Sequence, residues 1–123
     1  MEFAILISLF LLLLFGMIEL GRAIQVSQIL TNAAREGARR AIVPGATNTQ
    51  VEQIISTYMT AAAIPSHETS IQINGTAGSL ATAASHDELA VRVSTPYASV
   101  SWGVMRLIPA DRVFSATVTT RKE

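Results

Sequence analysis

Cysteine is absent from this chain, and its absence excludes disulfide bonds and thiolate metal sites. An excess of either charge is also missing, because nine lysine and arginine residues balance nine acidic ones. The only basic cluster consists of Arg35, Arg39 and Arg40. Nucleic acids demand a basic face for their phosphates, so the sequence indicates no nucleic-acid partner.

Catalytic signatures are missing as well. The sequence contains no zinc-protease, nucleotide-binding or serine-hydrolase motif, and its two histidines, His67 and His86, lie far apart. The run His86-Asp87-Glu88 is the only local group that could attract a metal, and a surface loop explains it more simply. We therefore expect no enzymatic activity, no metal site and no cofactor.

Charge is absent from a long run near the start, where residues 3–18 read FAILISLFLLLLFGMI. A helix that is apolar on every side must lie in lipid or among other apolar helices. Its 16 residues span roughly 24 Å, and extension to Ile24 gives roughly 33 Å, against about 30 Å for a bilayer core. We expect residues 1–24 to be a membrane anchor or filament core and residues 25–123 to be a globular head.

The helical pattern continues to Val43, where Pro44 and Gly45 stop it. Beyond Ala23 it becomes amphipathic, so the second half of this helix should belong to the head. The apolar stripe comprises Val26, Ile29, Leu30, Ala33, Ala34, Gly37, Ala38, Ala41 and Ile42. Within it Ala33, Gly37 and Ala41 recur every four residues and permit close backbone approach, so we expect the head to pack there.

A short second helix is predicted to begin at Asn48 or Thr49, either of which can cap it. It should end before Pro65 and lie against that stripe. Alternation of apolar and polar residues then predicts three strands around Ile71–Ile73, Leu89–Val93 and Phe114–Val118. The expected fold is α+β: a long N-terminal helix, a short helix and a small three-stranded antiparallel sheet.

Two connections complete this interpretation. The segment Gly75–Ser85 is rich in Gly, Ala, Ser and Thr, so we expect an exposed loop. The segment Pro96–Pro109 contains Tyr97, Val100, Trp102, Val104, Met105 and Leu107 and should fold onto the sheet or meet a neighbour. Asn74-Gly75-Thr76 matches a glycosylation sequon, although an Asn-Gly turn at a strand end is the simpler interpretation.

Charged residues near the end of the apolar run need partners. Glu19 lies three residues before Arg22 on one helical face, so we expect a neutralised interfacial pair.

The N-terminus has no basic region and no cleavage pattern follows the apolar run, so the helix should be retained. A count of positive charges would keep the Arg-containing side in the cytoplasm, and we therefore expect that a basic leader has been removed.

The N-terminal motifs closely resemble those of the TadE-like family of pilins and pseudopilins in the tight-adherence branch of type IV pili. Family members commonly read VEFA, a Leu-rich run, FGxxELGRA and AAREGARxA. The matching positions here are Glu2-Phe3-Ala4, Phe15-Gly16, Glu19-Leu20-Gly21-Arg22-Ala23 and Ala33-Ala34-Arg35-Glu36-Gly37-Ala38-Arg39. The match is specific over the N-terminal helix, whereas the head resembles the family only in general style.

The resemblance implies cleavage by a prepilin peptidase, insertion in the bacterial inner membrane with a periplasmic head, and polymerisation by an inner-membrane assembly machinery into an extracellular pilus. The protein would then be its own main partner, in a homo-oligomeric helical filament. The residues expected at subunit contacts are Glu2, Phe3, Leu6, Phe10, Leu13, Phe15, Gly16, Glu19 and Arg22. Glu2 matches the pilin glutamate that is thought to meet a neighbour's N-terminal amine.

Three functions remain open at this point. The chain is expected to be a structural pilus subunit that polymerises through its apolar helix. It could instead be a minor pseudopilin outside the bulk of the filament, or a single-pass periplasmic adaptor that never polymerises. The unbroken helix from Ile24 to Val43 favours a subunit, because an adaptor would more often carry a linker there.

Overall fold

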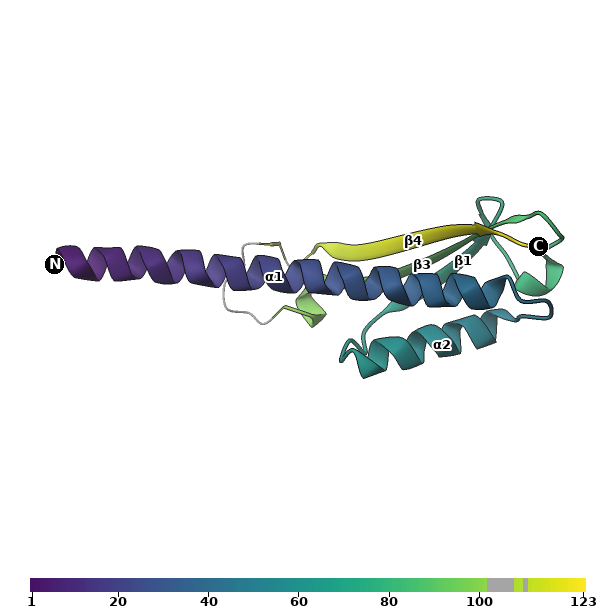
Figure 1. The fold of residues 1–123 in the computed structure, drawn as a ribbon, viewed down its shortest axis with the longest axis horizontal. Coiled ribbons are helices and arrows are strands. Elements are labelled where there is room, and N and C mark those ends of the chain that lie inside the picture. Colours follow the sequence, from purple (N-terminus) through teal and green to yellow (C-terminus); the bar gives the residue numbers. More distant parts are fainter. Residues whose placement is uncertain (102–107, 110) are drawn as a thin grey trace.

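A computed structural model describes residues 1–101, 108–109 and 111–123, and it consists of a head on a long rod (Figure 1). The rod is α1, Glu2–Ala41, a 40-residue helix roughly 60 Å long at about 1.5 Å per residue. It ends two residues before the predicted position, and Gly45 follows with a φ of 77°. That conformation is accessible to glycine at little cost, so the chain reverses there.

The second helix, α2, spans Asn48–Ala61 and runs back beside α1 (Figure 1). Its N-cap is Thr47, whose hydroxyl accepts a hydrogen bond from the backbone N–H of Gln50 at 3.3 Å. The helix begins at Asn48, one of the two predicted starts, but its cap is Thr47 and not Asn48 or Thr49. The side chain of Asn48 instead joins α2 to residues 78–80. Its Nδ2 donates to the carbonyl of Gly78, and its Oδ1 accepts from the N–H of Leu80.

The sheet contains four antiparallel strands in the order β2-β1-β3-β4. Their bounds are Glu68–Ile73 for β1, Thr76–Ala77 for β2, Glu88–Pro96 for β3 and Val113–Arg121 for β4. The three long strands are those that alternation predicted. Nine consecutive residue pairs join β3 to β4, from Glu88 with Arg121 to Pro96 with Val113.

The prediction of three strands was wrong because β2 is too short and too exposed to show alternation. It pairs with β1 across an Asn74-Gly75 turn, and both turn residues have positive φ, 51° and 83°. This confirms the interpretation of Asn-Gly as a hairpin turn. The predicted exposed loop Gly75–Ser85 also holds a 3-10 helix, η1, at Leu80–Thr82, and Leu80 is buried.

A second 3-10 helix, η2, spans Tyr97–Ser99 after β3. Tyr97 and Val100 are both buried in the core, as expected for an apolar segment that folds onto the head. The ring of Tyr97 packs edge-on against Phe114 of β4, with 5.4 Å between centroids. The other apolar residues of this segment, Trp102, Val104, Met105 and Leu107, lie outside the described residues.

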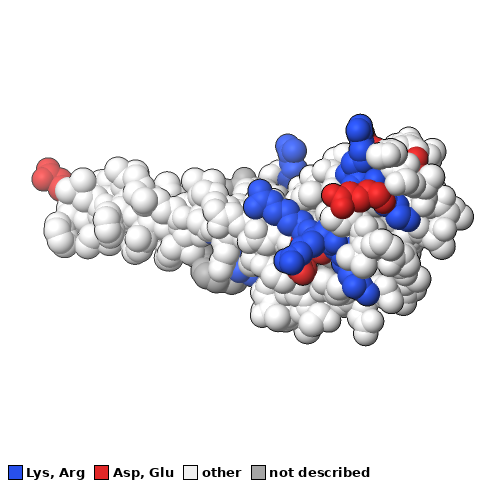
Figure 2. Space-filling model, turned by 45° about the vertical axis from the view of Figure 1, so that its right-hand side comes forward, with Lys and Arg blue, Asp and Glu red and all other residues white. Residues whose placement is uncertain are grey.

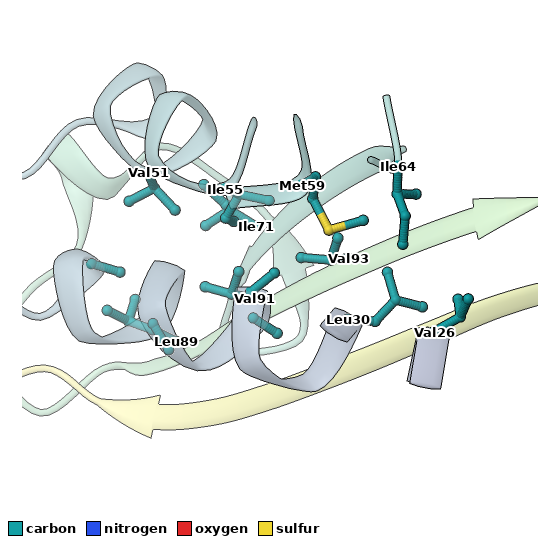
Figure 3. Packing of buried hydrophobic residues seen from close by; sticks show 14 of the residues in the cluster. Val26, Leu30, Val51, Ile55, Met59, Ile64, Ile71, Leu89, Val91 and Val93 are labelled. Atoms are coloured by element: carbon teal, nitrogen blue, oxygen red, sulfur yellow. The ribbon is translucent and has the colours of Figure 1, made fainter. Parts of the chain in front are cut away.

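The core lies between two helices and one face of the sheet. Figure 3 shows Val51, Ile55 and Met59 of α2 pointing toward α1 and the strands, where Val91 and its β3 neighbours meet them. The stripe predicted on α1 is in contact with this cluster, and seven of its nine residues are buried: Val26, Leu30, Ala33, Ala34, Gly37, Ala38 and Ala41. Charged side chains gather on the head (Figure 2).

At Gly37, both α2 and β3 lie close to α1. A Cβ atom built there would lie 2.6 Å from Cδ1 of Ile55 and 3.2 Å from Cγ1 of Val91. The hydrogen of glycine therefore lets α2 and β3 both contact α1 at one position. The predicted packing residues Ala33 and Ala41 are buried one turn to either side.

Replacing Gly37 by Leu should destabilise the head by about 1 to 3 kcal/mol, since a bulky side chain cannot enter this contact without moving Ile55 and Val91. The melting temperature of the full chain in detergent should fall by roughly 5 to 20 °C. Gly21→Leu is the matched control on the same helix, because a Cβ there meets nothing within 4 Å. Equal melting temperatures for the two variants would contradict the close packing at Gly37.

Candidate membrane and assembly surface

The first half of α1 protrudes from the head (Figure 1), and the side chains of residues 1–14 are all exposed. Its middle residues Leu9 and Phe10 are 60% and 63% exposed. In Figure 2 this segment carries no charged side chain except at the tip, where Glu2 lies. We call residues 1–18 the apolar rod.

Length and composition make α1 compatible with a membrane span. Its most apolar 18-residue window has a mean hydropathy of 2.6, and 6% of that window is buried by the rest of the molecule. Within the described residues it is the one helix that is long and apolar enough to cross a bilayer. The core helix of a soluble protein can be equally long and apolar, but such a helix is mostly buried. This window is mostly exposed.

The residues predicted for assembly fall into two groups. Those nearer the N-terminus are exposed on the rod: Glu2, Phe3, Leu6, Phe10 and Leu13. Phe15, Gly16 and Arg22 are half-buried, and Glu19 is only 6% exposed. The second group therefore lies where the rod enters the head.

Glu19 and Arg22 both contact the segment that follows β3. The hydroxyl of Tyr97 donates to Oε1 of Glu19, in a contact buried from solvent. Nε of Arg22 donates to the carbonyl oxygen of Val100 at 3.1 Å, and another guanidinium nitrogen donates to Gln25 Oε1 at 3.0 Å. The predicted Glu19–Arg22 pair stays a prediction, and these contacts with the head were not predicted. They attach the head to α1 just beyond the apolar rod.

The Tyr97 contact is asymmetric. Oε2 of Glu19 is buried and has no hydrogen-bond partner in the described part of the chain. Burial, followed by the hydrogen bond to Glu19, raises the pKa of the Tyr97 phenol above its ordinary value of 10.0. The fold therefore favours the protonated phenol, which is the form that can donate to the carboxylate.

Sequence reasoning missed Tyr97 as a partner for Glu19, because 78 residues separate them. One signal was available. A carboxylate at the end of an apolar run needs a donor, and Tyr97 is an aromatic residue with a polar end in a segment too apolar to be a free loop.

The far end of the head is held by a separate polar network. The Asn74 amide donates to Oδ1 of Asp87 at 3.0 Å, and Asn74 Oδ1 accepts from the N–H of Glu88 at 3.0 Å. The Asn74 amide, and next the N–H of Ala84, hold the pKa of Asp87 below its ordinary value of 3.8. The candidate sequon and part of the His86-Asp87-Glu88 run thus serve to join two loops.

One protein-family model matches the apolar rod and most of the rest of α1. Residues 1–39 match the family model described as TadE-like protein. The match bears out the resemblance seen in the N-terminal motifs, and it covers the apolar rod and most of α1. No match was found among curated proteins, and none among solved structures. The TadE-like match and the apolar helix together fit a protein associated with a Tad pilus.

Replacing Tyr97 by Phe should weaken the attachment of the head to the TadE-like helix, because it leaves the buried carboxylate of Glu19 without its donor. Loss of one partner of a buried hydrogen bond costs about 1 to 3 kcal/mol. Thermal melts of the full chain in detergent at neutral pH would measure this change. A melting temperature equal to that of the parent would show that the contact adds no stability.

The parent should also lose stability with increasing pH. A pKa raised on folding contributes stability that is complete below about pH 10 and is lost as the pH rises toward the folded value. The decrease in melting temperature between about pH 9 and 11 should therefore be smaller in Tyr97→Phe than in the parent. The same decrease in both proteins would rule out Tyr97 as the group responsible.

Proposed function

We propose that this protein is a structural subunit of a Tad-like type IV pilus and that it polymerises through its apolar rod. One observation carries the proposal: the rod is apolar on all sides, and its own head leaves it uncovered. The TadE-like match over the same residues supports this function.

Exposing the apolar rod to water would cost more free energy than the fold of a typical domain provides. Thirteen large apolar side chains between Phe3 and Leu20 are exposed. At about 1.5 kcal/mol each, their exposure to water would cost on the order of 20 kcal/mol. That exceeds the total stability of a typical domain, which is about 5 to 15 kcal/mol. The monomer therefore needs lipid, or a bundle of similar helices, around its first half.

The same surface suits both environments. Lipid tails and apolar side chains solvate a leucine-rich helix almost equally well, so the rod can pass from a bilayer into a filament core without meeting water. We propose that the subunit spans the inner membrane with its head in the periplasm and later becomes part of an extracellular filament. Its partners would be other copies, a prepilin peptidase and the membrane assembly machinery.

The continuity of α1 supports a filament subunit over a tethered adaptor. No break separates the rod from the head, because one helix runs from Glu2 to Ala41. An adaptor benefits from a flexible linker that lets its head search for a partner. In a filament, a rigid connection instead places every head in the same position relative to the helical core.

Replacing Leu9 by Arg should abolish filament formation, because a charge at the middle of the rod costs about 2.5 to 3.5 kcal/mol in a bilayer. In a filament of many copies this cost would recur at every subunit. Gln28→Arg, on the polar and exposed face of the same helix, is the matched control and should assemble normally. Electron microscopy of sheared filaments, with mass-spectrometric identification of this chain in them, provides the measurement.

Two results would count against the proposal. If the parent chain remains in the membrane fraction and is absent from purified filaments, it is an anchored adaptor. If Leu9→Arg forms filaments as well as Gln28→Arg does, the apolar rod is not the polymerising element.

A further inference from the structure

Among the residues that the structure describes, no strand pairs with the outer edge of the sheet at β4. Strand β4 is last in the strand order and pairs on one side only, with β3. Its residues Val113–Thr120 carry no charge and no proline, and the nine-pair ladder contains no bulge. Soluble proteins normally blunt such edges with charge, proline, a bulge or short length. This edge has none of these features until Arg121.

The flanking hydrogen bonds show which backbone groups of β4 point outward. The N–H of Tyr97 donates to the carbonyl of Arg112 at 2.8 Å, and the N–H of His86 donates to the carbonyl of Lys122 at 2.8 Å. Even-numbered residues of β4 therefore face β3, because backbone groups alternate sides along a strand. The N–H and C=O groups of Ser115, Thr117 and Thr119 point away from the sheet.

A second open stretch lies at the opposite edge. Strand β2 pairs only with Gln72 and Ile73, so the outer side of residues 68–71 of β1 is not covered by a strand. The N–H of Asn74 donates to the carbonyl of Glu88 at 2.9 Å, which shows that even-numbered residues of β1 face β3. The backbone groups of Thr69 and Ile71 therefore point outward.

We propose that β4 of one copy pairs in parallel with β1 of the next copy, so that the sheets of neighbouring heads become continuous. Strands β1 and β4 run in the same direction, because each is antiparallel to β3. Copies that enter one membrane or one filament share the orientation of α1, and so their sheets also share a direction. Two copies related by pairing of β4 with β4 would be antiparallel and would point their rods in opposite directions.

The register of this contact follows from the internal ladders. Ile71, Val91 and Val118 lie at one level across the sheet. At zero offset, β2 of the partner subunit would collide with the end of β4, because β2 covers β1 at Gln72 and Ile73. A two-residue offset, about 7 Å along the strand, reduces the overlap to the last residue of β4, because only Arg121 then lies beside a residue that β2 covers, Gln72.

At that offset, Thr69 of the partner subunit lies beside Val118. Its N–H then meets the carbonyl of Thr117, and its carbonyl meets the N–H of Thr119, which is the stagger that parallel pairing requires. The contact joins two different edges, so it is heterologous and repeats from copy to copy. An axial offset at every repeat gives a helical array.

This inference rests on the proposed function, because it requires copies with parallel rods. The absence of cysteine makes disulfide trapping specific. At the two-residue offset, Ser70 of one copy lies beside Thr119 of the next, both on the sheet face away from the helices. A chain with Ser70→Cys and Thr119→Cys, assembled in cells and mildly oxidised, should give a ladder of covalent multimers.

Three control variants accompany this chain. Thr57→Cys with Thr119→Cys places one thiol on the exposed face of α2 and should give no ladder. Thr119→Cys alone should form no covalent dimers. Covalent dimers of this variant would overturn the proposal, because they would show β4 paired with β4. Ser70→Cys alone should also remain monomeric.

A pair of proline variants tests the hydrogen bonds themselves. Thr119→Pro removes an N–H that points outward, so the head should melt as the parent does while filament yield falls about tenfold. Thr120→Pro removes an N–H that faces β3 and should lower the melting temperature of the head.

The outcomes separate the two proposals. Filaments that form normally from Thr119→Pro and give no ladder from the Ser70 and Thr119 cysteine pair would overturn the sheet contact and leave the proposed function standing. An absence of this chain from filaments of the parent would overturn the proposed function, and the sheet contact with it.

Discussion

The structure depends on a single helix that has two environments. The backbone hydrogen bonds of α1 run without interruption from the apolar rod into the head, so both halves share one axis. The first half presents apolar side chains on every side, whereas the second half presents a stripe that α2 and the sheet cover. Because the helix is continuous, the direction of the rod determines the direction of the strands, and the proposed contact between copies depends on this constraint.

The elements with a strong periodic signal were predictable from the sequence. The charge-free run and the small residues around Gly37 indicate the rod and the packing stripe, and alternation indicates the three long strands. β2 escaped prediction because two residues cannot show a period. The cap was misplaced because Thr47, Asn48 and Thr49 are all good capping residues, and only the tertiary contact of Asn48 with Leu80 shows which one is free to cap.

The contacts at the entry of the rod into the head show a different limit. Spacing along a helix correctly brings Glu19 and Arg22 to one face, but it says nothing of groups distant in sequence that compete for them. In the fold, Tyr97 donates to Glu19 and Arg22 donates to the carbonyl of Val100. Spacing along the helix could not predict these contacts, because the surface around the two side chains is another part of the same chain.

The position of the Tyr97 contact affects the head's freedom above a bilayer. Glu19 lies seven residues before Val26, the first buried apolar residue of the stripe, and this interval spans roughly 10 Å of helix. The head therefore overlaps the last turns of the segment expected to be a membrane anchor, residues 1–24. When that segment spans a bilayer, as we propose, the head would rest among the lipid headgroups and could tilt only together with its helix.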